Sequence, residues 1–288
     1  MKANSNNLDV LVIGAGFLGR QLAEYLRKSG LNVGVASRSS PSKTSNSFKV
    51  DLLDSHSIGN TLRNSRPNCI ILTAFNFSLD SEINLKMVRN LLVQLSLENQ
   101  NPKFVYYSSS AEYGSLKTLR SKFSEVSPQN PINKYGEIKA LITNELVAEL
   151  EHHNILRIFN PYSTEMPGKY FLGKIWREIR QMQKAESGLV RSIDLSYHSD
   201  VRDFINLQSL FEVTENIVRR NDDIGVLNVA SGTGTKISDL TEMLITKYCI
   251  GRLSLKLDES KPFSSLPYSI GDVSKLISLG IIPKKLEI

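Results

Sequence analysis

Short apolar runs alternate with amphipathic stretches along the first half of the chain. The runs with the length and β-branched content of buried strands are 9–13 (DVLVI), 31–37 (LNVGVAS), 69–75 (CIILTAF) and 103–109 (KFVYYSS). Apolar residues at helical spacing lie between them, at 21–30 and 83–97. This alternation predicts βαβ units, and the continuous apolar strands predict a mainly parallel sheet buried on both faces.

The alternation weakens in the second half of the chain. A strong helix from about Tyr135 to Glu151 and a strand at 154–160 continue the pattern. The segment that follows is helical and basic, and after Gly232 short helices mix with turns. We therefore predict an α/β fold, a Rossmann-type doubly wound parallel sheet with a smaller mixed α/β C-terminal substrate lobe. The expected domains are 1–162 for the dinucleotide-binding domain, with a return segment at about 199–230, and 163–198 and 231–288 for the substrate lobe.

Composition narrows the class of protein. The chain has 288 residues, of which 41% are apolar and 22% charged, as in soluble globular proteins. Its net charge is +6, but the cations are scattered rather than clustered, so no nucleic-acid partner is expected. A small anionic ligand accounts for a basic cleft equally well, and the alternative is a solvated basic surface without functional meaning. No apolar run is long enough to span a membrane, and the polar start predicts no secretion signal. The two distant cysteines fit a reducing, cytoplasmic setting, and no metal site is expected.

A glycine-rich segment, GAGFLG, joins the first predicted strand to the first predicted helix. Gly14 permits the tight turn, Gly16 lets a pyrophosphate approach the backbone, and Gly19 lets helix and strand pack closely. The phosphates would then lie at the helix N-terminus, where unpaired N–H groups favour negative charge, and Phe17 and Leu18 of this segment are further expected contacts. In this strand–turn–helix context the motif predicts dinucleotide binding.

The end of the second predicted strand bears on which dinucleotide is bound. An NAD site usually has a carboxylate there for the ribose 2′-hydroxyl, whereas this chain has Ser37 and Arg38. A hydroxyl and a guanidinium suit a 2′-phosphate, so NADP(H) is favoured and NAD(H) stays possible. The alternative for Arg38 is a solvated loop arginine. The expected cofactor contacts are Gly14, Gly16, Phe17, Leu18, Gly19, Ser37, Arg38, Asp51, Leu52, Thr73, Ala74, Tyr135 and Lys139, with Asp51 and Leu52 near the adenine.

A serine-rich strand end, SSSAEYG, precedes a Tyr-x-x-x-Lys pair. That spacing occurs three times, at Tyr113/Lys117, Tyr135/Lys139 and Tyr170/Lys174. Only the second pair lies at the start of a strong helix, one turn apart, shortly after the serine strand. A nearby ammonium and a nicotinamide lower the pKa of a tyrosine enough for proton exchange with a carbinol oxygen, and a serine steadies that oxygen. We therefore expect Ser109, Tyr135 and Lys139 to be catalytic.

These motifs together resemble the extended short-chain dehydrogenase/reductases that act on nucleotide sugars. The ordered set comprises GAGFLG, SSAEYG, YGEIK, LRIFNPY, VRDFI, GVLNVASG and LPYSIGDVSK. The resemblance implies that Ser109, Tyr135 and Lys139 are catalytic, that Asn160 contacts substrate phosphates and that Arg202 holds the nucleotide diphosphate. The expected substrate contacts are Ser110, Asn160 and Arg202. The resemblance also implies a homodimer and a nucleotide-diphosphate sugar as substrate.

Departures from the family pattern reduce the number of reactions that we expect of this chain. The acid pair of the family's dehydratases is replaced by Ser110 and Ala111, which argues against dehydration. Pro262 occupies the position of an arginine found in many 4-epimerases. With Ser37 and Arg38, these departures favour an NADP-dependent reductase of a nucleotide-diphosphate 4-keto-6-deoxyhexose, of use in polysaccharide biosynthesis. A 4-epimerase with tightly bound NAD and a non-catalytic dinucleotide-binding relative stay as alternatives.

Overall fold

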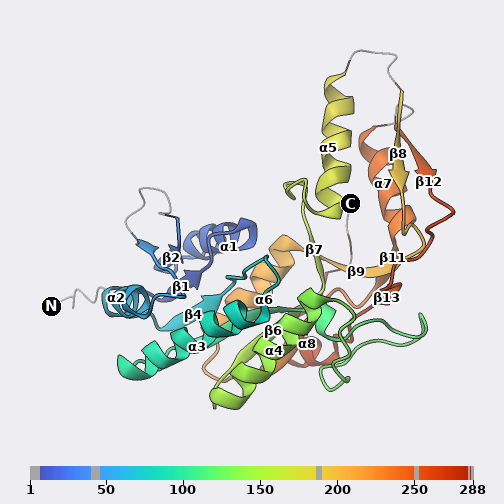
Figure 1. Ribbon diagram of the computed structural model, residues 1–288. Helices are drawn as coiled ribbons and strands as arrows, with labels where there is room; N and C mark the ends of the chain where they lie inside the picture. The colour runs from blue at the N-terminus through green and yellow to red at the C-terminus, as the bar shows by residue number, and fades with distance from the viewer. Residues whose placement is uncertain (1–6, 40–45, 186–189, 250–252, 285, 287–288) are drawn as a thin grey trace. The chain divides into compact units, whose positions relative to one another are not determined.

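The computed structural model describes residues 7–39, 46–185, 190–249, 253–284 and 286 (Figure 1). The chain forms two compact units. The first contains residues 1–109, 133–157 and 211–227, and the second contains 110–132, 158–210 and 228–288. The sequence had placed 110–132 and 199–210 with the dinucleotide-binding domain. They belong to the second unit because strand β9 (Val201–Asn206) pairs with strands of that unit, and because Phe123 packs in a cluster with Phe159 and Ile270.

A seven-stranded sheet organises the first unit, in the order β10-β6-β5-β4-β1-β2-β3. Its strands are β1 (Val10–Ile13), β2 (Val33–Ser37), β3 (Ser47–Lys49), β4 (Cys69–Leu72), β5 (Lys103–Ser109), β6 (Asn154–Ile158) and β10 (Gly225–Val229). The pairs β1–β2, β1–β4, β2–β3 and β4–β5 are parallel. This order, reversing at β1, is that of a doubly wound Rossmann sheet, so the predicted fold class is confirmed.

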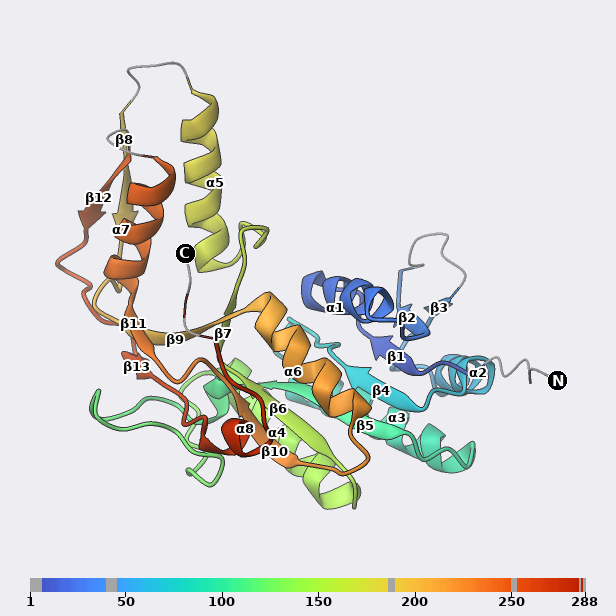
Figure 2. The same cartoon turned by 180° about the vertical axis from the view of Figure 1, so that it is seen from behind.

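Helices cover both faces of this sheet, as Figure 2 shows from behind. They are α1 (Phe17–Lys28), α2 (Ser55–Ser65), α3 (Ser81–Leu97), α4 (Lys134–Glu149) and α6 (Leu207–Arg219). The apolar faces of α2, α3 and α4 share one core with the sheet, as the buried Ile58, Leu91 and Ile142 illustrate. On the other face, α1 is joined to α6 by a hydrogen bond of 2.9 Å from the Tyr25 hydroxyl to Glu215. The periodicity had predicted α1, α3 and α4, but not α2.

The second unit is built on smaller sheets. Strand β9 lies between β11 (Gly234–Lys236) and β13 (Tyr268–Ser269) and also pairs with β7 (Asn160–Tyr162). A separate parallel pair joins β8 (Arg191–Leu195) to β12 (Leu253–Leu257). The helices are α5 (Phe171–Lys184), α7 (Ile237–Tyr248), α8 (Ser274–Ser278) and the short 3-10 helix η1 (Ser110–Glu112). No helix among the described residues is long and apolar enough to cross a membrane.

Candidate active site

The glycine loop leaves an open approach to the start of α1. Gly14 has φ of +119°, and a Cβ there would lie 2.6 Å from the backbone nitrogen of Ala74. A Cβ on Gly19 would lie 1.9 Å from the Gly14 carbonyl oxygen, so this helix can pack against the loop only with glycine there. Gly16, the N-cap of α1, has no atom within 4 Å of such a Cβ and no side-chain cap. The helix N-terminus can therefore accept an anion directly on its N–H groups.

A cavity of about 290 Å³ lies beside this loop, entirely within the first unit. Its lining includes eight of the expected cofactor contacts: Gly14, Gly16, Ser37, Arg38, Asp51, Leu52, Thr73 and Ala74. Thr73 also holds the loop, because its hydroxyl donates to the Gly14 carbonyl over 3.0 Å. The remaining expected contacts are not in the lining: Phe17, Leu18 and Gly19 form the first turn of α1, and Tyr135 and Lys139 lie on α4.

The part of the cavity lined by the end of β2 and by Asp51 carries few fixed polar contacts. The Ser37 hydroxyl donates to the Ser39 carbonyl over 2.6 Å, and Arg38 is exposed. Asp51 is also exposed, and its carboxylate accepts a hydrogen bond from the Leu53 backbone N–H at 3.0 Å. The end of β2 therefore offers a hydroxyl and a guanidinium to a ligand, and the carboxylate of Asp51 in the cavity lining belongs to the turn after β3.

Tyr135 and Lys139 lie one turn apart at the start of α4. The helix begins at this point because the side chain of its N-cap, Asn133, accepts from the Gly136 N–H over 2.8 Å. Lys139 is only 4% exposed, and its ammonium donates to the Tyr107 carbonyl on β5 over 2.7 Å. A buried ammonium needs such a partner, and this hydrogen bond fixes Lys139 on the side of the serine strand.

Aromatic rings surround the Lys139 ammonium. It lies 4.6 Å from the ring centroid of Tyr106, 5.0 Å from that of Phe75 and 5.9 Å from that of Tyr135. Phe75 packs edge-on against Tyr135, with the centroids 5.1 Å apart, and it also lines the cavity. Phe75 therefore joins the cofactor cavity to the tyrosine–lysine pair. No motif marks Phe75 in the sequence, although it follows Thr73 and Ala74 directly after β4.

The predicted catalytic serine is the last residue of β5. Ser109 is half-buried there and belongs to the first unit with Tyr135 and Lys139. Behind it, the Thr143 hydroxyl on α4 donates to Ser108 over 3.2 Å, which ties the end of the strand to the helix. Ser110 begins η1 and lies in the second unit.

The two other tyrosine–lysine pairs have different surroundings. Tyr113 is buried, stacks on Phe123 with centroids 4.7 Å apart, and donates to the Asn228 side chain over 2.7 Å. Its partner in sequence, Lys117, is not on a helix. Tyr170 is the N-cap of α5 in the second unit. Neither tyrosine is in the unit that holds the glycine loop.

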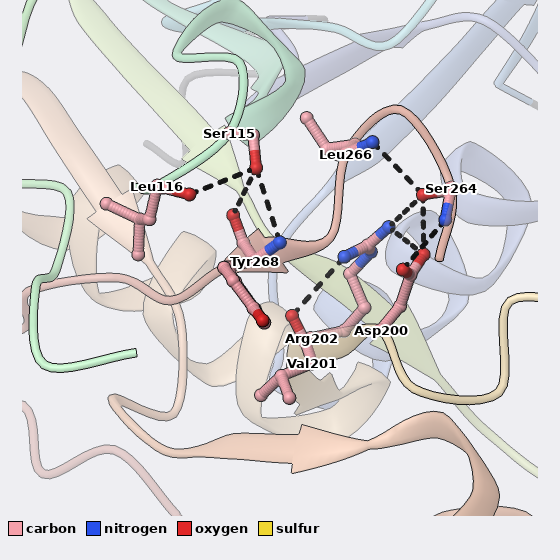
Figure 3. A network of polar contacts seen from close by, with 8 residues as sticks. All are labelled: Ser115, Leu116, Asp200, Val201, Arg202, Ser264, Leu266 and Tyr268. Carbon is pink, nitrogen blue, oxygen red and sulfur yellow. Dashed lines mark hydrogen bonds and ion pairs between the residues drawn. The ribbon is translucent and has the colours of Figure 1, made fainter. Parts of the chain in front are cut away.

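Arg202, the expected diphosphate contact, lies on β9 in the second unit and is held by a polar network (Figure 3). Its Nη2 donates to the Asp200 carboxylate over 2.7 Å and to the Ser264 hydroxyl over 3.2 Å. Burial lowers the pKa of Arg202, although Asp200 opposes that shift. Asn160, on β7, donates to the Asp203 carbonyl over 2.9 Å. Sequence reasoning did not find Asp200 or Ser264, because nothing local links two polar residues 64 positions apart.

Comparison with known proteins shows which enzymes this chain and its fold are similar to. The chain is similar to the GDP-6-deoxy-D-mannose reductase of Pseudomonas aeruginosa, with 25% identity over 248 residues, 80% of this chain and 76% of that protein. Its fold is similar to that of a Thermus thermophilus UDP-glucose 4-epimerase in complex with NAD, with a TM-score of 0.79 and 24% identity over 96% of this chain and 94% of the other. The structure of RMD from Pseudomonas aeruginosa, complexed with NADPH, has a TM-score of 0.79 and 21% identity, covering 97% and 93%.

A family model also matches this chain directly. It covers residues 10–230, well over half of the chain, from the first strand of the sheet through β10. The family and the enzyme class expected from the sequence are thereby confirmed. The chain belongs to the NAD dependent epimerase/dehydratase family.

Proposed function

We propose that the protein is an NADP(H)-dependent reductase that converts a nucleotide-diphosphate 4-keto-6-deoxyhexose into the corresponding 6-deoxyhexose. The observation that carries this proposal is the cavity at the glycine loop, where Ser37 and Arg38 of the β2 end face the ligand space. A guanidinium at this place suits a 2′-phosphate. The similarity to a GDP-6-deoxy-D-mannose reductase supports the same reaction.

The residues of the first unit fit a dinucleotide. The uncapped start of α1 and the open space over Gly16 suit the pyrophosphate, and Leu52 and Asp51 suit the adenine. Thr73 and Ala74 line the same cavity next to Phe75, which leads toward Tyr135. When bound, a reduced nicotinamide would supply the hydride for carbon 4 of the sugar.

The chain's own groups would handle the oxygen and its proton. Tyr135 donates its hydroxyl proton to the carbonyl oxygen as the carbon accepts the hydride, so the ketone becomes an alcohol and the tyrosine becomes a phenolate. The Lys139 ammonium, close to the Tyr135 ring, stabilises that negative charge. The Ser109 hydroxyl donates a hydrogen bond to the same oxygen and orients it. A proton from solvent then restores the tyrosine. In the second unit, Asn160 and Arg202 are proposed to bind the substrate phosphates.

An NAD-dependent 4-epimerase is the second candidate, because the fold is equally similar to a UDP-glucose 4-epimerase in complex with NAD. The ultraviolet spectrum and the denatured extract of the purified protein separate the two. A reductase is expected to be purified without cofactor and to bind NADPH at least ten times more tightly than NADH. Retained NAD that is released only on denaturation, together with interconversion of UDP-glucose and UDP-galactose, would reject the reductase.

The oligomeric state of the protein and its cellular compartment belong to the same proposal. Large apolar side chains are exposed on α3 and α4, with Val93 55%, Leu97 68%, Leu141 44% and Val147 43% exposed. We propose that these two helices form a homodimer interface in a cytoplasmic enzyme, where both buried thiols stay reduced. Light scattering should give twice the mass of 32.2 kDa. A Leu97→Lys variant should give the single mass.

A further inference from the structure

The backbone of Arg202 is fixed on both sides. It lies on β9, in register with Thr235 of β11 and Ser269 of β13. Its side chain is only 11% exposed. The guanidinium makes three hydrogen bonds: Nη2 donates to Asp200 and Ser264, and Nη1 donates to the Val201 carbonyl over 3.3 Å. This arginine is therefore held in one orientation before any ligand arrives.

The Asp200 carboxylate is itself anchored. It is 1% exposed, and one oxygen accepts from the Ser264 backbone N–H over 3.0 Å. The other oxygen accepts from the Ser264 hydroxyl over 2.5 Å and from Arg202 over 2.7 Å. The Ser264 hydroxyl also accepts from the Leu266 N–H over 3.1 Å, which fixes its direction (Figure 3). Moving this aspartate away from the arginine would leave a buried charge without its partner, which is strongly unfavourable.

The network leaves one part of the guanidinium available. An arginine carries five N–H donors. Among the residues that the structure describes, the Nε–H of Arg202 and one Nη1 hydrogen have no acceptor. Each of these two N–H groups can donate a charge-assisted hydrogen bond to a phosphate oxygen.

We propose that Asp200 and Ser264 are positioning residues, which hold Nη2 of Arg202 so that its Nε–H and its remaining Nη1 hydrogen are presented to the diphosphate of the nucleotide sugar. This inference rests on the proposed function. In this role Asp200 orients the guanidinium of Arg202 and does not compete with the substrate phosphates for it. The two roles predict opposite effects when the charge is removed, because a competitor's loss would tighten diphosphate binding and a positioning residue's loss weakens it.

The test measures binding of UDP, GDP and dTDP by calorimetry to the full chain in the presence of NADPH. Asp200→Asn and Ser264→Ala should each weaken the diphosphate that binds best by roughly ten-fold, the usual effect of losing one hydrogen bond to a charged group. Ser264→Thr, which keeps the hydroxyl, should stay within about two-fold of wild type. Ser260→Ala is the matched control, because Ser260 lies on the same segment but bonds to Asp258.

Measurements other than diphosphate binding separate the positioning of Arg202 from general damage to the fold. NADPH affinity should be unchanged in all variants. With a nucleotide sugar that the enzyme converts, the KM of Asp200→Asn and Ser264→Ala should rise while their kcat stays the same. Tighter or unchanged diphosphate binding in Asp200→Asn would overturn the inference and leave the proposed function standing. If the wild-type protein binds none of the three diphosphates, the proposed function falls and this inference falls with it.

Discussion

Replacing Arg38 by alanine should weaken NADPH binding and leave NADH binding unchanged. Arg38 follows the end of β2, lines the cavity at the glycine loop and is exposed. A charged hydrogen bond to a 2′-phosphate is worth more than a neutral one, but solvent screens an exposed pair. We therefore expect a loss of about 1–2 kcal/mol, which is roughly a 5- to 30-fold rise in the Kd for NADPH.

Calorimetric titration of both cofactors into wild type and Arg38→Ala measures this effect. Lys49→Ala is a matched control, because Lys49 is an exposed cation on β3 that does not line the cavity. The difference between the two cofactors should also shrink as salt is raised, since an exposed ion pair is screened. Equal weakening of NADPH and NADH, or no change in either, would show that Arg38 is a solvated loop arginine and would remove the main argument for NADP(H).

Three further substitutions test other parts of the account. Gly19→Ala should lower the free energy of unfolding, measured by urea titration, by about 3 kcal/mol, because its Cβ would lie 1.9 Å from a loop carbonyl oxygen. Wild-type stability of this variant would refute the tight packing of α1 against the loop. Phe75→Leu should lower kcat roughly two- to five-fold by loosening the Lys139 ammonium that we propose to be catalytic. Phe77→Leu, which alters the same cavity, should leave kcat unchanged, and equal effects of the two substitutions would contradict this role of Phe75. The hydrogen bond from Arg89 lowers the pKa of Glu145 from its ordinary 4.5, so the pair's stabilisation should be present above that pH and disappear as the pH falls through the lower folded-state value. Thermal unfolding of Glu145→Gln across this range should lack that dependence.

The sheet and its covering helices followed from the sequence because burial on both faces leaves a strong local signal. The runs at 9–13 and 103–109 correspond to β1 and β5, and GAGFLG joins β1 to α1 as predicted. Helix α2 had no such signal, because its sequence SHSIGNTLRNS is mostly polar and only Ile58 and Leu62 supply large buried apolar side chains. Local periodicity therefore predicts elements with a wide apolar face and misses those with a narrow one.

The site was only partly accessible to sequence reasoning for a different reason. Motif spacing singles out Gly16 and Lys139 as candidates, because each belongs to a short segment with its own geometry. The contacts of Phe75 with Tyr135 and of Asp200 with Ser264 join residues 60 or more positions apart, which no spacing rule reaches. The unit boundaries differ from the expected ones for the same reason, since the pairing of β9 with β11 and β13 is set by long-range contacts.

The most direct measurement is the oxidation of NADPH by the purified protein in the presence of GDP-4-keto-6-deoxymannose and its UDP and dTDP counterparts, with product stereochemistry read by NMR. The account predicts stoichiometric loss of reduced nicotinamide with one of these substrates, and a fall in kcat of at least about 100-fold in Tyr135→Phe, as expected when a general acid is removed. The variant should still fold and bind NADPH. Turnover that survives in Tyr135→Phe, or no NADPH oxidation with any of the three ketosugars, would contradict the account.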